Sequence, residues 1–223
     1  MTPRQTHIEV GYRGLLSAGL ILAAWFVSLF WLMRVELTVY AVAWIPLAIW
    51  LRSFLNVGLF ITAHDAMHGT LFAESQRINH GVGALCVGLY AGFSYKHLLL
   101  EHHEHHRLSG TLDDPDFADD YEHGFVRWLF SFMVRYCSVA QLVRVTFIYV
   151  SLLLLSESPT NVVLFWAVPS IMSALQLFYF GTYRPHRIEE ECFEDDDDEE
   201  RKRFEKDDAQ HEEDATARIV VVV

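Results

Sequence analysis

The residues best equipped for chemistry are histidines, and they gather in two short stretches. One stretch is the pair His64 and His68, and the other, within residues 101–107, contains His102, His103, His105 and His106. Residues three or four positions apart share one face of a helix. His64 therefore pairs with His68, and His102 pairs with His105 and His106. Because neutral imidazole is the commonest metal ligand, these two faces predict a multi-histidine metal site.

The predicted ligands come from both stretches and from one histidine further along the chain. They are His64, His68, His102, His105, His106 and His186. His103 points off the shared face and is either a ligand or a bystander. Carboxylates nearby either take part in the site, by orienting imidazole N–H groups, or are simply solvated. These are Asp65, Glu101, Glu104, Asp113 and Asp114. Histidines 7, 80, 97 and 123 are predicted to have no metal role.

More than four imidazoles favour two ions, or one ion of higher coordination, over a closed structural zinc site. The zinc-protease pattern HExxH is absent, because Asp65 follows His64 and His103 follows His102. Iron with open coordination positions, suited to oxygen chemistry, is the preferred hypothesis, and a zinc membrane hydrolase is disfavoured.

The composition divides the 223 residues into a predominantly apolar region and an acidic C-terminal segment. Residues 189–214 carry 16 acidic and 4 basic side chains, which accounts for the net charge of −12 of the whole chain. We expect residues 1–187 to form one membrane domain and the acidic residues 188–223 to be a disordered tail. No basic surface for nucleic acid is expected. The three cysteines contain no CxxC pair, which argues against a disulfide framework or a zinc ribbon.

Four long apolar runs predict an all-α integral membrane protein with four transmembrane helices in two hairpins. The runs cover residues 14–33, 37–63, 145–155 (with a start as early as 139) and 161–183. Pro46 is expected to kink the second span, and Arg52 is expected to snorkel or to pair within the bundle. Residues 70–81 are expected to be a loop. Residues 82–100 and 125–144 are expected to lie in the membrane interface.

This arrangement brings all the candidate ligands to one side of the membrane. The turns on the other side, residues 34–36 and 156–160, hold one basic residue between them. The ligand side carries Arg4, Arg13, Arg77, Lys96, Arg107 and Arg187. By the positive-inside rule, the metal site and the tail face the cytoplasm.

Several of these stretches resemble the bacterial carotenoid β-ring 4-ketolases of the membrane fatty-acid desaturase/hydroxylase superfamily. The similar stretches are residues 64–69, 88–95, 102–107, 113–117, 178–183 and 185–187. The resemblance covers roughly residues 10–187. It implies two non-haem iron ions held by histidines, O2 as the oxidant, an external electron donor such as ferredoxin, and a carotenoid substrate drawn from membrane lipid. Related enzymes oxidise C4 of the β-ionone ring of β-carotene twice, and the product loses water to give a ketone.

The chain departs from the family at its C-terminal end. Family members carry a third histidine box of the HxxHH type beyond the position of His186, whereas only His211 follows it here. We expect that this segment has been lost or replaced, for example by a frameshift; the alternative is that carboxylates of the tail substitute for it. The hypotheses are therefore a carotenoid 4-ketolase, a catalytically inactive relative that keeps the membrane fold, or a carotenoid or acyl-chain hydroxylase or desaturase.

Overall fold

The structure is a computed structural model that describes residues 3–109, 114 and 124–185, with side chains described from residue 11 onward. The described residues are helical or irregular and contain no strand. The chain has two compact units, Met1–Tyr179 and Phe180–Val223. The helix packing and the histidine site belong to the first unit. The predicted domain boundary at residue 187 and the acidic tail lie outside the described residues.

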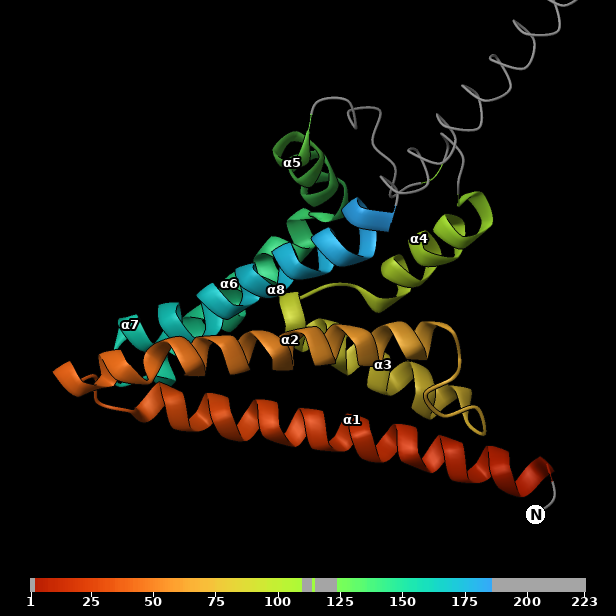
Figure 1. Ribbon diagram of the computed structural model, residues 1–223, viewed down its shortest axis with the longest axis horizontal. Coiled ribbons are helices and arrows are strands. Elements are labelled where there is room, and N and C mark those ends of the chain that lie inside the picture. The colour runs from red at the N-terminus through yellow and green to blue at the C-terminus, as the bar shows by residue number, and fades with distance from the viewer. Residues whose placement is uncertain (1–2, 110–113, 115–123, 186–223) are drawn as a thin grey trace, which may run out of the picture. The chain divides into compact units, whose positions relative to one another are not determined.

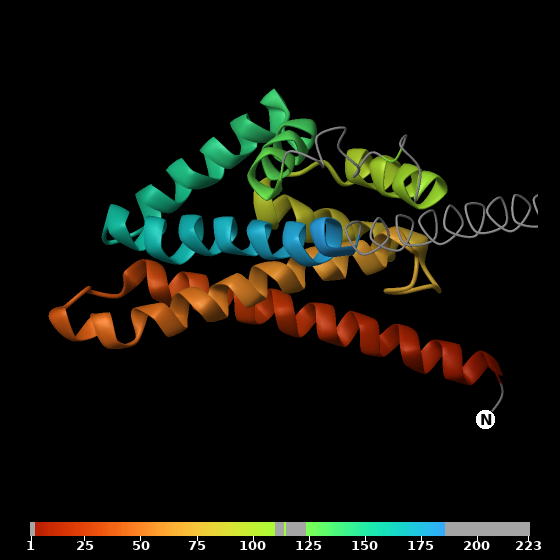
Figure 2. The same ribbon diagram turned by 45° about the horizontal axis from the view of Figure 1, so that its top comes forward.

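Helices α1 (Pro3–Arg34) and α2 (Ile45–Met67) run side by side in opposite directions, as Figures 1 and 2 show. A short 3₁₀ turn, η1 (Val39–Ala43), joins them. The expectation of a Pro46 kink was wrong, because α2 begins at Ile45 and Pro46 occupies its first turn. The missing N–H of proline removes no hydrogen bond there, so the ring is compatible with a straight helix.

Helix α3 (Gln76–Ala91) packs against α2 and is followed by α4 (Tyr95–Leu108). The prediction of a loop through residue 81 was wrong, because Ser75 caps the helix by accepting a hydrogen bond from the backbone N–H of Ile78. Gly92 ends α3 in the left-handed conformation, with φ of 66°. This glycine separates the predicted interfacial segment into two helices.

The remaining helical elements of the described residues follow in chain order. They are α5 (Phe125–Tyr136), α6 (Val139–Leu155), α7 (Pro159–Val162), the π-helical turn η3 (Val163–Ala167), α8 (Val168–Phe178) and the π-helical turn η4 (Tyr179–Tyr183). Helix α8 and η3 contact α2 on the bundle's inner side. In the described part of the chain, three helical stretches are long and apolar enough to cross a membrane: Gly11–Arg34, Ile45–Met67 and Pro159–Tyr183. A fourth span requires α5 and α6 to count as one, although they meet at 91°.

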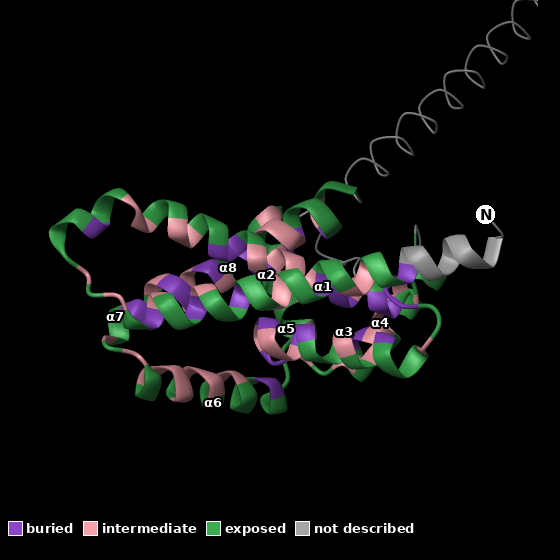
Figure 3. Cartoon of the chain, turned by 90° about the horizontal axis from the view of Figure 1, so that it is seen from below, coloured by how far each residue is buried: buried purple, intermediate pink, exposed green. Residues whose placement is uncertain are grey.

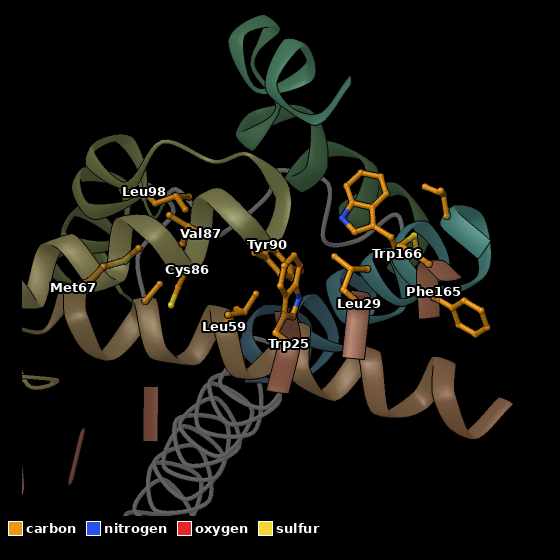
Figure 4. Close-up of a cluster of buried hydrophobic side chains, with 13 residues drawn as sticks. Trp25, Leu29, Leu59, Met67, Cys86, Val87, Tyr90, Leu98, Phe165 and Trp166 are labelled. Carbon is orange, nitrogen blue, oxygen red and sulfur yellow. The ribbon is translucent and has the colours of Figure 1, made fainter. Parts of the chain in front are cut away.

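The core lies where α1, α2, α3 and η3 face one another. Figure 4 shows Trp25 and Leu29 of α1, Leu59 of α2 and Tyr90 of α3 pointing into it. Outward-facing turns remain exposed, as the green segments of Figure 3 show, and on α1 they carry large apolar residues such as Leu16, Leu20 and Trp31. An apolar exterior around a buried interior fits a bundle surrounded by lipid.

Arg52 pairs within the bundle, one of the two outcomes expected for it. Its Nη1 donates to the Trp25 carbonyl at 2.8 Å and to Ser28 Oγ at 3.0 Å, and its Nε donates to the Phe165 carbonyl at 3.2 Å. Asn56 accepts a hydrogen bond from Trp25 Nε1 at 2.8 Å. This buried polar network fastens α1, α2 and η3 together midway along α2.

The two turns predicted to share the side away from the histidines do lie together. The Met33 carbonyl accepts hydrogen bonds from Ser156 Oγ at 3.1 Å and from the Glu157 N–H at 3.0 Å. Asn161 Nδ2 donates to the Val35 carbonyl at 2.8 Å. The end of α1 and the start of α7 are therefore joined at one end of the bundle, and α2 carries its histidines to the other end, about 34 Å away at 1.5 Å per residue.

Candidate metal centre

The last turn of α2 supplies the first pair of imidazoles. His64 and His68 are four residues apart, and their ring centroids are 4.7 Å from each other. Helix α2 ends at Met67 with His68 as its C-cap, and Gly69 turns the chain away with a positive φ of 72°. This sharp ending places both rings at the rim of the bundle.

Helix α4 supplies the second pair. His102 and His106 are also four residues apart, with ring centroids 4.6 Å apart. The His102 ring lies 4.6 Å from that of His64 and 4.7 Å from that of His68, and the His106 ring lies 5.0 Å from that of His68. The two helices therefore bring four imidazoles into a single group, although His68 and His102 are 34 positions apart in the sequence.

One ligand atom from each of the four rings lies within 4.8 Å of every other. The closest pair, His68 Nε2 and His102 Nε2, is 3.0 Å apart. Nitrogen atoms bound at about 2.0–2.1 Å to one ion would be roughly 2.9–3.4 Å apart. These four imidazoles, here called the four-histidine cluster, thus offer a donor set for one divalent ion, although the more distant nitrogen pairs would have to close for all four to bind it.

The surroundings favour the neutral form of His68, His102 and His106, which is the form that binds metal. Desolvation and the neighbouring imidazoles His64, His106, His68 and His105 lower the pKa of His102 to about 3. Desolvation and neighbouring histidines also lower the pKa of His68 and that of His106, although Asp65 opposes the shift at His68 and Asp114 opposes it at His106. His68 and His106 are exposed, so the cluster remains accessible from outside the bundle.

His105 makes a different contact from its neighbours on α4. Its Nδ1 lies 2.8 Å and 3.0 Å from the two carboxylate oxygens of Asp114. The Asp114 side chain is completely buried, and that of His105 is 22% exposed. Such a carboxylate fixes the tautomer and ring orientation of an imidazole, and directs Nε2 as the nitrogen able to bind a metal. His105 is not one of the four close rings, and its role as a ligand stays a prediction.

The other predicted site residues fall into three groups. Exposed His103 lies next to the cluster, with its ring 6.3 Å from that of His102. Asp65 Oδ1 is 3.8 Å from His64 Nδ1, Glu101 is 3.9 Å from His97, and Glu104 pairs with Arg107, so none of these three carboxylates hydrogen-bonds the cluster. Asp113 and His186 lie outside the described residues.

The sequence reasoning missed one partner near this end of the bundle. His80, expected to be uninvolved, has its Nδ1 3.0 Å from the Tyr95 hydroxyl. The spacing of the two residues, on α3 and on the first turn of α4, carries no pattern that would have revealed the pair. Both side chains are half-buried.

Known proteins are similar to this chain over the segments that carry the four-histidine cluster. The family described as Fatty acid desaturase matches residues 38–155, a range that contains the whole four-histidine cluster. The chain is 42% identical over 144 residues to a protein named Beta-carotene ketolase from Paracoccus sp. (strain N81106 / MBIC 01143), covering 64% of this chain and 58% of that one.

Two algal proteins are similarly close. The chain is 44% identical over 137 residues to Beta-carotene ketolase of Haematococcus lacustris, covering 61% of this chain and 42% of that one. It is 41% identical over 168 residues to Zeaxanthin 4-ketolase of Chlamydomonas reinhardtii, covering 74% and 37%. The chain thus spans between about a third and three-fifths of the length of these relatives. No solved structure matches it.

Proposed function

Because the chain belongs to the fatty acid desaturase family, we propose that its four-histidine cluster is part of a membrane iron centre that introduces a keto group at C4 of the β-ionone ring. The proposed substrate is β-carotene or a related carotenoid. The observation that carries this proposal is the convergence of His64 and His68 with His102 and His106, in a chain 41–44% identical to proteins named as carotenoid ketolases.

The donor set suits the proposed metal. Iron accepts imidazole nitrogen, and iron centres that use O2 keep positions open for it. Bound iron would supply the oxygen chemistry, whereas the protein supplies binding, orientation and access. The four-histidine cluster would hold the ion, and its exposed rings, His68 and His106, leave the approach open. No side chain other than the ligands is assigned a catalytic role.

A second iron, expected from the family resemblance, would need further ligands. His105 is the strongest of these, since Asp114 fixes its Nδ1 and so orients Nε2. His186 and His103 complete the proposed set, with Asp65, Asp113 and Asp114 as residues that orient or add to it. The four close rings fit one ion, so binding of the second ion is the more demanding part of the proposal.

The proposed location follows from where the substrate is. A carotenoid dissolves in the bilayer, so it would reach the centre from lipid, whereas a soluble electron donor would approach from water. The last turn of α2, at the rim of the bundle, would be accessible both to the carotenoid and to the electron donor. Arg77, Lys96 and Arg107, on the helices around the cluster, support a cytoplasmic position for this rim by the positive-inside rule.

Expression of the full chain in a β-carotene-producing cell tests the proposal. We expect ketocarotenoids with one or two 4-keto groups, identified by mass and absorption spectrum, and their loss in the His102→Ala variant. Unchanged β-carotene, with the chain inserted in the membrane, would overturn the proposed activity. In that case iron bound in the purified chain would favour the alternative of an inactive relative, and a hydroxylated carotenoid or an altered acyl chain would favour a hydroxylase or desaturase.

The alternative of an inactive relative has its own supporting observation. No HxxHH box follows residue 186 in the sequence. A chain that binds one ion in the four-histidine cluster, with no product in the carotenoid assay, is the result that this alternative predicts.

A further inference from the structure

The position of α4 decides whether the two imidazole pairs can meet. His102 and His106 sit in its C-terminal half, whereas its attachment to the rest of the bundle lies in its N-terminal half. Leu98 is the buried residue of this helix, and Tyr95 on the first turn lies within hydrogen-bond distance of His80 on α3. Tyr95 and His102 are seven residues apart, so they share a face about two turns, or roughly 10.5 Å, from each other.

Tyr95 lies in a space that a glycine leaves open on α3. A Cβ atom added at Gly83 would be 2.5 Å from Tyr95 Cε2 and 2.8 Å from the Cβ of Ala66. Gly83 is therefore a point at which α2, α3 and the start of α4 approach closely. Ala66 lies between His64 and His68 in the last turn of α2, so this contact is directly behind one of the two imidazole pairs.

The Tyr95 hydroxyl adds direction to this contact. It lies 3.0 Å from His80 Nδ1, one turn before Gly83 on α3. Partial burial raises the pKa of Tyr95, which keeps the phenol protonated at neutral pH and able to donate to the imidazole. The hydrogen bond fixes both the rotation and the height of the first turn of α4 against α3.

Helix α3 is in turn fixed to the end of α2. The fully buried Asn79, next to His80, donates from Nδ2 to the Ala66 carbonyl at 2.6 Å and accepts from the Phe72 N–H at 3.1 Å. The path from one imidazole pair to the other therefore runs through Ala66, Asn79 and Gly83, then through Tyr95 to α4.

We propose that Tyr95, docked against Gly83 and hydrogen-bonded to His80, is a positioning residue that sets α4 so that His102 and His106 meet His64 and His68. The functional role of this contact rests on the proposed metal centre, but the docking of Tyr95 involves no metal. It gives a role to a tyrosine and a histidine that take no part in metal binding. The residues named act on the cluster through the helix backbone and do not touch an ion.

Matched variants on α3 test the close approach. Gly83→Ala should push α4 away, whereas Gly88→Ala, on the same helix, places its Cβ with nothing within 4 Å. Alanine favours a helix over glycine, so Gly88→Ala should be neutral or stabilising. Opposite effects from the same substitution on one helix would therefore report the Tyr95 contact and not helix propensity.

Milder variants test the hydrogen bond. Tyr95→Phe and His80→Leu remove one partner each, whereas His80→Asn keeps an acceptor near the position of Nδ1 with a similar helix propensity. Tyr90→Phe is the control for losing a tyrosine hydroxyl elsewhere, since its partner is Ser173 on α8. These variants keep the test decisive if Gly83→Ala fails to fold.

The first readout is the distance between spin labels on α2 and α4 in the full metal-free chain in lipid nanodiscs. Labels at Ile61 and Leu100, which are 50% and 61% exposed, suit this purpose, with Cys137 and Cys192 replaced by Ser. We expect a shifted or broadened distribution for Gly83→Ala, Tyr95→Phe and His80→Leu. The distribution should be unchanged for Gly88→Ala, Tyr90→Phe and His80→Asn.

The second readout is Co²⁺ affinity, followed by the visible bands of the bound ion. Tyr95→Phe should weaken binding by about 2- to 12-fold, the equivalent of one hydrogen bond, and Gly83→Ala by about 10-fold or more, as for other groups that orient ligands. Unchanged label distances in both variants would overturn the inference, whatever the metal result. A wild-type chain that binds no Co²⁺, but whose variants shift the labels, would leave the docking role in place and overturn the proposed metal centre.

Discussion

The Arg52 network and the four-histidine cluster, two polar groups of the described bundle, are built in opposite ways. In the network around Arg52, donors meet acceptors: guanidinium N–H groups reach backbone carbonyls of Trp25 and Phe165, and Asn56 accepts from an indole. In the four-histidine cluster, imidazoles face other imidazoles, and two Nε2 atoms approach to 3.0 Å. Protein atoms satisfy most of the first group, as is normal for buried polar groups, although the buried Arg52 Nη2 has no hydrogen-bond partner in the described residues.

This difference indicates that the Arg52 network has a structural role, whereas the four-histidine cluster is suited to binding a cation. At most one proton can lie between two imidazole nitrogens, so a group of four rings whose ligand atoms lie within 4.8 Å of one another keeps nitrogen lone pairs available. A cation bound among the four rings would accept these lone pairs. We therefore expect damage to the Arg52 network to affect stability, and damage to the four-histidine cluster to affect metal binding.

The largest expected effect is the loss of a central ring of the four-histidine cluster. His102→Ala should weaken Co²⁺ or Fe²⁺ binding by more than about 100-fold, because changes to residues that only orient ligands already cost 10- to 100-fold. The thermal stability of the metal-free chain should change little, since the removed ring sits among other imidazoles. Isothermal titration and a melting curve on the same preparation check both statements. Equal affinity in variant and wild type would contradict the assignment.

The opposite pattern is expected at Arg52. Arg52→Ala removes three hydrogen bonds and leaves a cavity between α1, α2 and η3, so the free energy of unfolding should fall by about 2–4 kcal/mol. Metal affinity of the folded variant should stay within about twofold of wild type, since the network lies several turns from the cluster. Denaturant unfolding in detergent measures the first quantity. A loss of affinity without a loss of stability would break the comparison.

A smaller effect is expected for the buried carboxylate beside the cluster. Asp114→Asn should weaken metal binding by about 10- to 100-fold if Asp114 orients His105 as a ligand. Glu104→Gln is the matched control, since its exposed carboxylate pairs with Arg107 and not with the cluster, and should have almost no effect. Equal affinities in the two variants would count against a ligand role for His105.

The last expected effect is a dependence on pH. The pKa of His102 is lowered to about 3, and those of His68 and His106 are lowered as well, so the unfolded chain binds more protons than the folded chain below about pH 6.5. The metal-free chain should lose stability as the pH falls from 6.5 toward 3. His102→Ala should reduce this dependence, whereas Arg52→Ala should leave it unchanged. A wild-type chain whose stability does not fall in this range would contradict the packing of the rings.

The sequence predicted the helices and the two imidazole pairs because both follow local rules. Long uncharged runs define spans, and a four-residue spacing puts His64 with His68, and His102 with His106, on common faces. The exact helix boundaries were harder. Pro46 was placed inside a helix that begins beside it, and the first turn of α3 was taken for a loop, because capping by Ser75 is a weaker signal than polarity.

What the sequence could not provide is the long-range geometry. His105 shares the helical spacing of its neighbours, yet its Nδ1 hydrogen-bonds Asp114. Helical spacing alone does not predict that contact. The pairing of Tyr95 with His80, and the space left for it by Gly83, depends on how three helices approach one another. The span count also stays open between three and four, because the 91° bend between α5 and α6 is a tertiary feature.

The most direct test of the central claim is X-ray absorption spectroscopy at the iron edge on the purified full chain, with metal content measured on the same sample. The account predicts at least one iron per chain, with several imidazole nitrogen neighbours that are lost in His102→Ala and retained in Arg52→Lys. A wild-type chain with no bound iron, or with iron whose imidazole signal is the same in His102→Ala, would contradict it.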